Sequence, residues 1–240
     1  ACAGYPKAWD LAQVLAVDPL FESTMEAANS LVVNRMGYSD HGRTHALVTA
    51  TNAMMIFGAG LALGWEPTFG LKSDSAVVVA LGSLLHDCGN SIAREQHHEL
   101  GVSVAQPLLE NLLARAYPAA RRQKMVLNIL ETIYTHDESV RAYSLEGSIV
   151  KIADGMDCEA GRSRLPAEFL NPNNRHRGSS DAIDFVHLEP VKSGQPLRIW
   201  AELNDKAGLF QLEEVLAKKI ESSVLKKSVV VEAFIEGKKI

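Results

Sequence analysis

A short apolar stretch that also carries a histidine and an aspartate constrains the fold of this 240-residue chain more than any other feature. Four apolar positions from Leu81 to Cys88 follow the i, i+3, i+4, i+7 spacing of one buried helix face. His86 and Asp87 lie side by side at the edge of that face. Because an isolated imidazole or carboxylate is costly to bury, this doublet requires a buried partner or a metal ion.

The segments on both sides of the doublet also have helical patterns. Pro, Asp and Gly residues at their ends are typical of helix starts and stops, such as Asp18-Pro19 and Gly89. We therefore expect a mainly α body. Its predicted helices are 6–17, 19–35, 41–63, 75–88, 96–115, 117–136 and 145–159.

The pattern changes in the last third of the chain. Residues 171–180 are polar and rich in turn formers, which predicts a loop or linker. Segments 183–191 and 197–203 alternate like strands around Ser193-Gly194, and an amphipathic helix (210–225) and a β-branched strand (228–235) follow. We predict a helical domain over 1–170, then a linker and a small β-β-α-β appendage over 171–240 that packs on the helical body.

Composition narrows the class of protein. A net charge of −5 argues against an extended nucleic-acid surface, and no uninterrupted apolar run is long enough to span a bilayer. Residues 1–10 lack the basic start and apolar run of a signal peptide. The three cysteines have no CxxC spacing, so we expect no disulfide framework and a reducing, cytoplasmic location.

Metal-binding residue types gather on the predicted helices. Six of the eight histidines lie between His41 and His136, and Asp154 lies on the next helix. Side chains from several helices are how metal sites are built in helical cores. Mixed imidazole and carboxylate donors suit Fe, Mn, Zn or Co, and Mg²⁺ fits the oxygen-rich side. The candidate donors are His45, His86, Asp87, His97, His98, His136 and Asp154.

The order of these residues resembles the H…HD…D signature of the HD superfamily of metal-dependent phosphohydrolases. His45, then His86-Asp87, then Asp154 reproduce it, and the match runs over about 38–164. Segments 39–45 and 159–166 look like those of a little-characterised prokaryotic branch. The resemblance implies that His45, His86, Asp87 and Asp154 bind a first metal ion.

Some branches of the superfamily have two more histidines and a second metal ion, bridged by the aspartate of the doublet. By resemblance His97 and His136 are the candidates here, with His98 as a substitute for His97. The longer Gly-Tyr-Pro signature of the cyclic-dinucleotide branch is absent after His98.

Divalent cations would activate a water molecule and polarise a phosphoryl oxygen, and cationic side chains would bind the other phosphate oxygens. We expect catalytic roles for Asp87 and for Lys151, which lies one turn before Asp154. Asp157, one turn after Asp154, is expected to orient a ligand or a water molecule. His41 is expected in an N-terminal helical turn or behind a ligand. The candidates for phosphate binding are Arg94, Lys151, Arg162 and Arg164.

The sequence therefore predicts a cytoplasmic metal-dependent phosphohydrolase with one or two divalent metal ions, acting on a phosphomonoester or a nucleotide. Two other functions stay open. One is a di-iron oxygenase on the same fold, which requires both His97 and His136 as ligands. The other is a non-catalytic protein that senses a nucleotide or dimerises through its appendage. The sequence also leaves homo-oligomer formation open.

Overall fold

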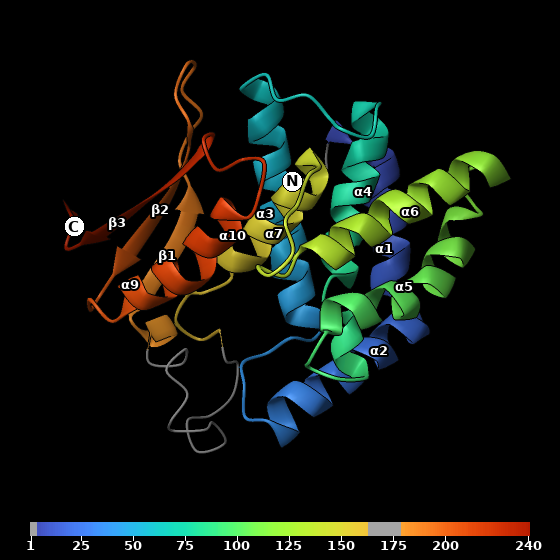
Figure 1. Ribbon diagram of the computed structural model, residues 1–240, viewed down its shortest axis with the longest axis horizontal. Helices are drawn as coiled ribbons and strands as arrows, with labels where there is room; N and C mark the ends of the chain where they lie inside the picture. Colours follow the sequence, from blue (N-terminus) through green and yellow to red (C-terminus); the bar gives the residue numbers. More distant parts are fainter. Residues whose placement is uncertain (1–3, 163–178) are drawn as a thin grey trace.

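The computed structural model describes residues 4–162 and 179–240, and it shows a helical body beside a small sheet (Figure 1). This confirms the predicted fold class, mainly α with a small α+β appendage. The bounds of the helices lie close to the predicted ones. The helices of the body are α1 (Pro6–Ala16), α2 (Pro19–Asn29), η2 (Ser30–Arg35), α3 (Arg43–Ala62), α4 (Lys72–Leu85), η3 (Cys88–Ser91), α5 (His97–Leu113), α6 (Ala119–Thr135) and α7 (Leu145–Met156).

Helix α4 is the centre of the helical body. Every residue from Asp74 to Leu85 is buried, and α1, α3, α6 and α7 all pack against the helix. The sequence predicts one apolar stripe, whereas the structure buries α4 on all sides, as its run of valine, alanine and leucine allows. Gly82 permits the close approach of α6, because a Cβ there would lie 2.1 Å from Thr132 Oγ1.

The doublet lies at the end of α4 and not within the helix. The helix ends at Leu85, Asp87 leaves helical geometry with φ −98° and ψ 4°, and a short 3₁₀ turn follows. The predicted helix 75–88 was therefore too long at its C-terminal end. Because the chain leaves the helix here, the Asp87 carboxylate lies between α3 and α7 on one side and α5 and α6 on the other.

Helix α3 is long and apolar enough to cross a bilayer, judged by length and composition alone. The core helix of a globular domain passes the same test. In this structure α3 packs against α4 and α7, and His45 and Thr49 on its inner face are fully buried. We therefore describe α3 as a core helix of the body.

The C-terminal part forms a four-stranded mixed sheet in the order β1-β2-β3-β4. Strands β1 and β2 are antiparallel, β2 and β3 are parallel, and β3 and β4 are antiparallel. The two-residue strand β4 was not predicted, because a segment so short has no detectable alternation. The strands are β1 (Ile183–Leu188), β2 (Leu197–Leu203), β3 (Val229–Ile235) and β4 (Lys238–Lys239).

A continuous helix connects β2 with the parallel strand β3 and lies between the sheet and the helical body (Figure 1). It consists of α9 (Gly208–Gln211), the π-helical η5 (Leu212–Ala217) and α10 (Lys218–Glu221). Both η5 and α10 pack against α7. Most of the expected linker, residues 171–180, lies outside the described residues.

Candidate metal centre

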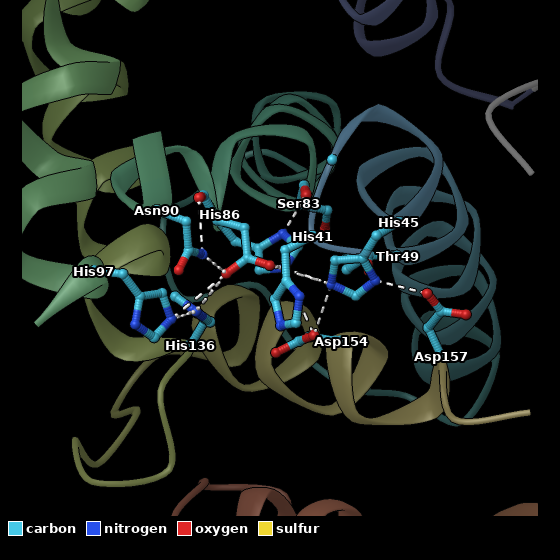
Figure 2. A network of polar contacts seen from close by, with 12 residues as sticks. His41, His45, Thr49, Ser83, His86, Asn90, His97, His136, Asp154 and Asp157 are labelled. Carbon is cyan, nitrogen blue, oxygen red and sulfur yellow. Dashed lines mark hydrogen bonds and ion pairs between the residues drawn. The ribbon is translucent and has the colours of Figure 1, made fainter. Parts of the chain in front are cut away.

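Six histidine and aspartate side chains from different helices meet beneath the end of α4 (Figure 2). The helical body brings together all the residues that the signature and its two added histidines single out. Those residues are His45 of α3, His86 and Asp87 after α4, His97 at the start of α5, His136 after α6 and Asp154 of α7. Among the described residues, the groups that can hold a metal ion are His45 with His86 and Asp154, His86 with Asp87 and His136, and His97 with His98 and Asp137.

One group of donors surrounds a point between α3, α4 and α7. The Nε2 atoms of His45 and His86 are 3.0 Å apart, and Asp154 Oδ1 lies 3.1 Å and 3.6 Å from them. Asp87 Oδ2 lies 3.4 Å from each Nε2. Metal–ligand bonds of about 2.0–2.2 Å place neighbouring donor atoms about 2.9–3.6 Å apart in tetrahedral or octahedral geometry. The four donors therefore have the spacing of a metal coordination shell.

A second group of donors shares Asp87 with the first. The Nε2 atoms of His97 and His136 are 3.1 Å apart, and Asp87 Oδ1 lies 3.5 Å and 3.7 Å from them. Each carboxylate oxygen of Asp87 thus faces a different pair of imidazoles. Asp87 has the position of a bridging ligand.

Hydrogen bonds fix the orientation of all four imidazoles. In each ring Nδ1 donates to an oxygen that can only accept: Asp157 Oδ2 for His45 at 2.6 Å, and a backbone carbonyl for the other three. Those carbonyls belong to Ser83, Arg94 and Ile133, for His86, His97 and His136 respectively. A neutral imidazole with its proton on Nδ1 has a lone pair on Nε2. In their neutral forms the four rings would therefore point lone pairs toward one another and toward carboxylate oxygens.

This arrangement requires a positive charge at its centre. Two lone pairs only 3.0 Å or 3.1 Å apart repel each other, and the buried Asp87 Oδ2 has no hydrogen-bond partner among the residues that the structure describes. A buried acceptor without a donor is costly. A cation placed among these atoms removes both problems, so the residues present fit a metal ion.

The pKa values indicate the charge of each group. Burial by itself lowers the pKa of His86, but Asp87 and Asp154 outweigh it and raise the pKa to about 10, so His86 is protonated at neutral pH and would lose that proton when a metal ion binds. Burial raises the pKa values of both carboxyls, but nearby positive groups, led by His86 for Asp87 and by Lys219 for Asp154, hold them well below the usual range. Burial lowers the pKa of His97 to about 3. The carboxylates are charged and His97 is neutral, which are the forms that bind metal.

Asp157 supports His45 from behind. Its Oδ2 accepts a hydrogen bond from His45 Nδ1–H and also forms an ion pair with Arg162 Nε at 3.1 Å. Arg162 is buried, and it donates to the backbone carbonyls of Asp157 and Asp40. Asp157 therefore orients a histidine, as expected from its position one turn after Asp154. Arg162 holds that aspartate and is committed to the structure, which differs from the expected role in phosphate binding.

Asn90 supports Asp87 and was not identified from the sequence. Its amide donates to Asp87 Oδ1 at 2.9 Å, and its own Oδ1 accepts from Arg94 Nη1 at 3.2 Å. Asn90 is completely buried. In the sequence it is a connector residue three positions after the aspartate, with no periodicity to mark it. Arg94 is partly exposed beside the second group of donors, so it keeps its candidacy as a phosphate-binding residue.

The structure places Lys151 away from the position that its expected catalytic role requires. Lys151 is fully buried, and its Nζ donates to the carbonyl of Val140 and to Ser222 Oγ at 3.0 Å. The ammonium is thus committed to the end of α10 and the loop before α7. A long side chain on α7 can reach either neighbour of that helix, and spacing alone does not decide which.

Lys219 of α10, and not Lys151, is the lysine that contacts Asp154. Its Nζ donates to Asp154 Oδ2 at 2.8 Å and to the carbonyl of His136 at 2.9 Å. Burial lowers the pKa of Lys219, but Asp154 outweighs this and raises it. No sequence signal pointed to this residue, because its contact depends on how the appendage packs.

The remaining candidate residues lie at the margin of the candidate centre or outside the described residues. His98 is buried beside His97, but its ring contacts Tyr134 and its Nε2 lies 3.9 Å from Glu99. It does not replace His97 beside Asp87. His41 packs its ring against His45 with centroids 5.7 Å apart, at the position expected behind a ligand. Arg164 lies outside the described residues.

A relative of this chain is known from Methanocaldococcus jannaschii. The uncharacterized protein MJ1020 of that organism is 36% identical over 220 residues, which cover 90% of this chain and 84% of the relative. No protein-family model matches the chain. Since the relative is itself uncharacterized, arguments about function depend on the site.

Proposed function

We propose that this chain, which belongs to the same family as the uncharacterized protein MJ1020 of Methanocaldococcus jannaschii, is a metal-dependent phosphohydrolase of the HD type. Its substrate would be a phosphomonoester or a nucleotide. The observation that carries the proposal is the position of Asp87, with one oxygen toward each pair of imidazoles. Such a donor set suits two divalent cations, which lower the pKa of a water molecule and polarise a phosphoryl oxygen when bound.

The protein residues would fall into two sets of ligands, one for each cation. Asp87 would bridge the two cations, His45, His86 and Asp154 would hold one, and His97 and His136 would hold the other. Asp157 and the backbone carbonyls behind the other rings keep each Nε2 directed inward. Because this orientation exists before substrate binds, no reorganisation is needed during the reaction.

Arg94 is the candidate for substrate phosphate. Lys151, Lys219 and Arg162 are buried and bound to protein oxygens, whereas Arg94 is partly exposed on the loop that leads to His97, with a hydrogen bond from Nη1 to Asn90 Oδ1. A guanidinium can bind two phosphate oxygens at once. Arg94→Ala is therefore expected to raise KM for a phosphate ester more than it lowers kcat.

Hydrolysis of p-nitrophenyl phosphate and of a panel of nucleotides, with Mn²⁺, Co²⁺, Zn²⁺ or Mg²⁺, tests the proposal. We expect phosphate release in the wild type and a loss of at least about 100-fold in His86→Ala. His187→Ala is the matched control, since His187 is an exposed histidine on β1. Equal activity in wild type and His86→Ala would refute the proposal.

The pairing of His97 and His136 beside Asp87 also supports a second candidate, a di-iron oxygenase. That function requires iron at both positions and consumption of oxygen. Protein loaded with Fe²⁺ alone, assayed for oxygen uptake, decides between the two. Turnover of phosphate esters by the Mn²⁺ protein without oxygen uptake by the iron protein favours the phosphohydrolase.

A further inference from the structure

One lysine of the C-terminal appendage reaches into the candidate metal centre. Lys219 is only 5% exposed, on the helix that lies between the sheet and the helical body. Its Nζ contacts groups from both halves of the centre: Asp154 Oδ2 at 2.8 Å and the backbone carbonyl of His136 at 2.9 Å. Glu138 Oε2 lies farther away, at 3.8 Å.

The two oxygens of Asp154 have different partners. Oδ1 faces the imidazoles, 3.1 Å from His45 Nε2 and 3.6 Å from His86 Nε2. Oδ2 accepts the charge-assisted hydrogen bond from Lys219. Bonds of this kind are about twice as strong as those between neutral groups. The ammonium therefore holds one oxygen of Asp154 away from the imidazole donors.

Packing between α7 and the last helix fixes this lysine. Next to Asp154, Gly155 lets the helix approach closely, since a Cβ there would lie 3.1 Å from both Leu216 Cδ1 and Lys219 Cδ. Lys151 binds Ser222 at the end of the same helix. The helix is thus held on both sides of Lys219, which leaves its side chain little freedom.

We propose that Lys219 is a positioning residue that keeps Asp154 a one-oxygen ligand and so keeps the coordination number of the bound ion low. This inference rests on the proposed metal centre. It also assigns a role to the appendage, which completes the active site of the helical body. A carboxylate without this restraint can turn and offer both oxygens to the same ion.

The absorption spectrum of Co²⁺ in the purified full-length protein tests the proposal, because the intensity of its visible bands falls as the coordination number rises. The variants are Lys219→Met, which removes the donor, and Lys219→Gln, which keeps a neutral one. Lys218→Met is the matched control, since Lys218 is the next residue and pairs with Glu214 on the surface.

We expect Lys219→Met to bind as much Co²⁺ as the wild type, with weaker visible bands. Its kcat for p-nitrophenyl phosphate should fall about 10- to 100-fold, the usual effect of losing a group behind a ligand. The band intensity and kcat of Lys219→Gln should lie between those of the wild type and Lys219→Met. Both values for Lys218→Met should match the wild type. Wild-type band intensity in folded Lys219→Met would overturn the proposal.

Two further results separate this proposal from the one on which it rests. If wild-type protein binds no Co²⁺, the metal centre itself is refuted, and this inference falls with it. If the wild type binds Co²⁺ but Lys219→Met does not fold, Lys219→Gln decides. A band intensity below that of the wild type supports the role of the ammonium, and an equal intensity overturns it.

Discussion

Replacing Asp157 with asparagine tests how the centre is oriented from behind. The His45 Nδ1–H donates to Asp157 Oδ2 at 2.6 Å, and both side chains are buried, at 0% and 8% exposure. The asparagine side chain of Asp157→Asn would keep the shape of this acceptor but lose its charge. Arg162 would keep its hydrogen bond to the backbone carbonyl of residue 157, which preserves the local fold.

The size of the effect follows from that geometry. Loss of a group that orients a metal-binding histidine costs about 10- to 100-fold in metal affinity. This corresponds to about 1.4–2.7 kcal/mol. Because an amide oxygen still accepts a hydrogen bond, we expect Asp157→Asn to lower metal affinity about 10-fold. Asp157→Ala leaves the buried Nδ1–H with only the hydroxyl of Thr49, 3.5 Å away, so we expect metal affinity to fall nearly 100-fold.

A competition titration measures these affinities. Metal-free protein and a coloured chelator share a limiting amount of Zn²⁺ or Mn²⁺, and the dissociation constant follows from the chelator absorbance. Asp10→Asn on the exposed side of α1 is the control, and it should bind like the wild type. Unchanged affinity in both Asp157 variants would refute the assigned role of the carboxylate.

Three other changes have definite expected results. Gly89→Ala places a Cβ 1.9 Å from the carbonyl oxygen of His97 and should cost about 3 kcal/mol, measured by urea unfolding; wild-type stability would contradict the close packing. Burial lowers the pKa of Lys151 to about 8, so folding disfavours its charged form. Wild-type stability should therefore rise from pH 8 to 10.5 relative to Lys151→Met, by at most about 3 kcal/mol, and parallel stability curves would contradict this. Chelation of the metal should lower Tm. Adding Mn²⁺ at about one hundred times Kd should raise the free energy of unfolding by about 2.7 kcal/mol, and a Tm unchanged by both treatments would exclude a bound metal.

The sequence was sufficient for the helical body, and the body brings the predicted donors close together. Helical periodicity placed His45 and Asp154 on separate helices and His86 at the end of a third. That these side chains bind metal stays a prediction. The exact end of α4 was missed, since Cys88 continues the apolar i, i+3, i+4, i+7 spacing past Leu85.

The misassignment of Lys151 has a different cause. Lys151 and Lys219 both have flexible four-carbon side chains, and each can reach several oxygens. Only the docking of α10 on α7 decides that Lys219 takes Asp154 and Lys151 takes Ser222. Contacts between segments so far apart in the chain leave no periodic signal in one sequence. Asn90 was missed for a similar reason, because its role depends on the 3₁₀ turn after Asp87.

The number of metal ions bound per chain is the most direct test of the proposed centre. Protein purified without chelator or affinity nickel would be analysed by elemental mass spectrometry, together with Asp87→Ala and His136→Ala. We expect two ions in the wild type, one in His136→Ala and a loss of both sites in Asp87→Ala, because Asp87 faces both pairs of imidazoles. Full metal content in Asp87→Ala, or none in the wild type, would contradict the proposed centre.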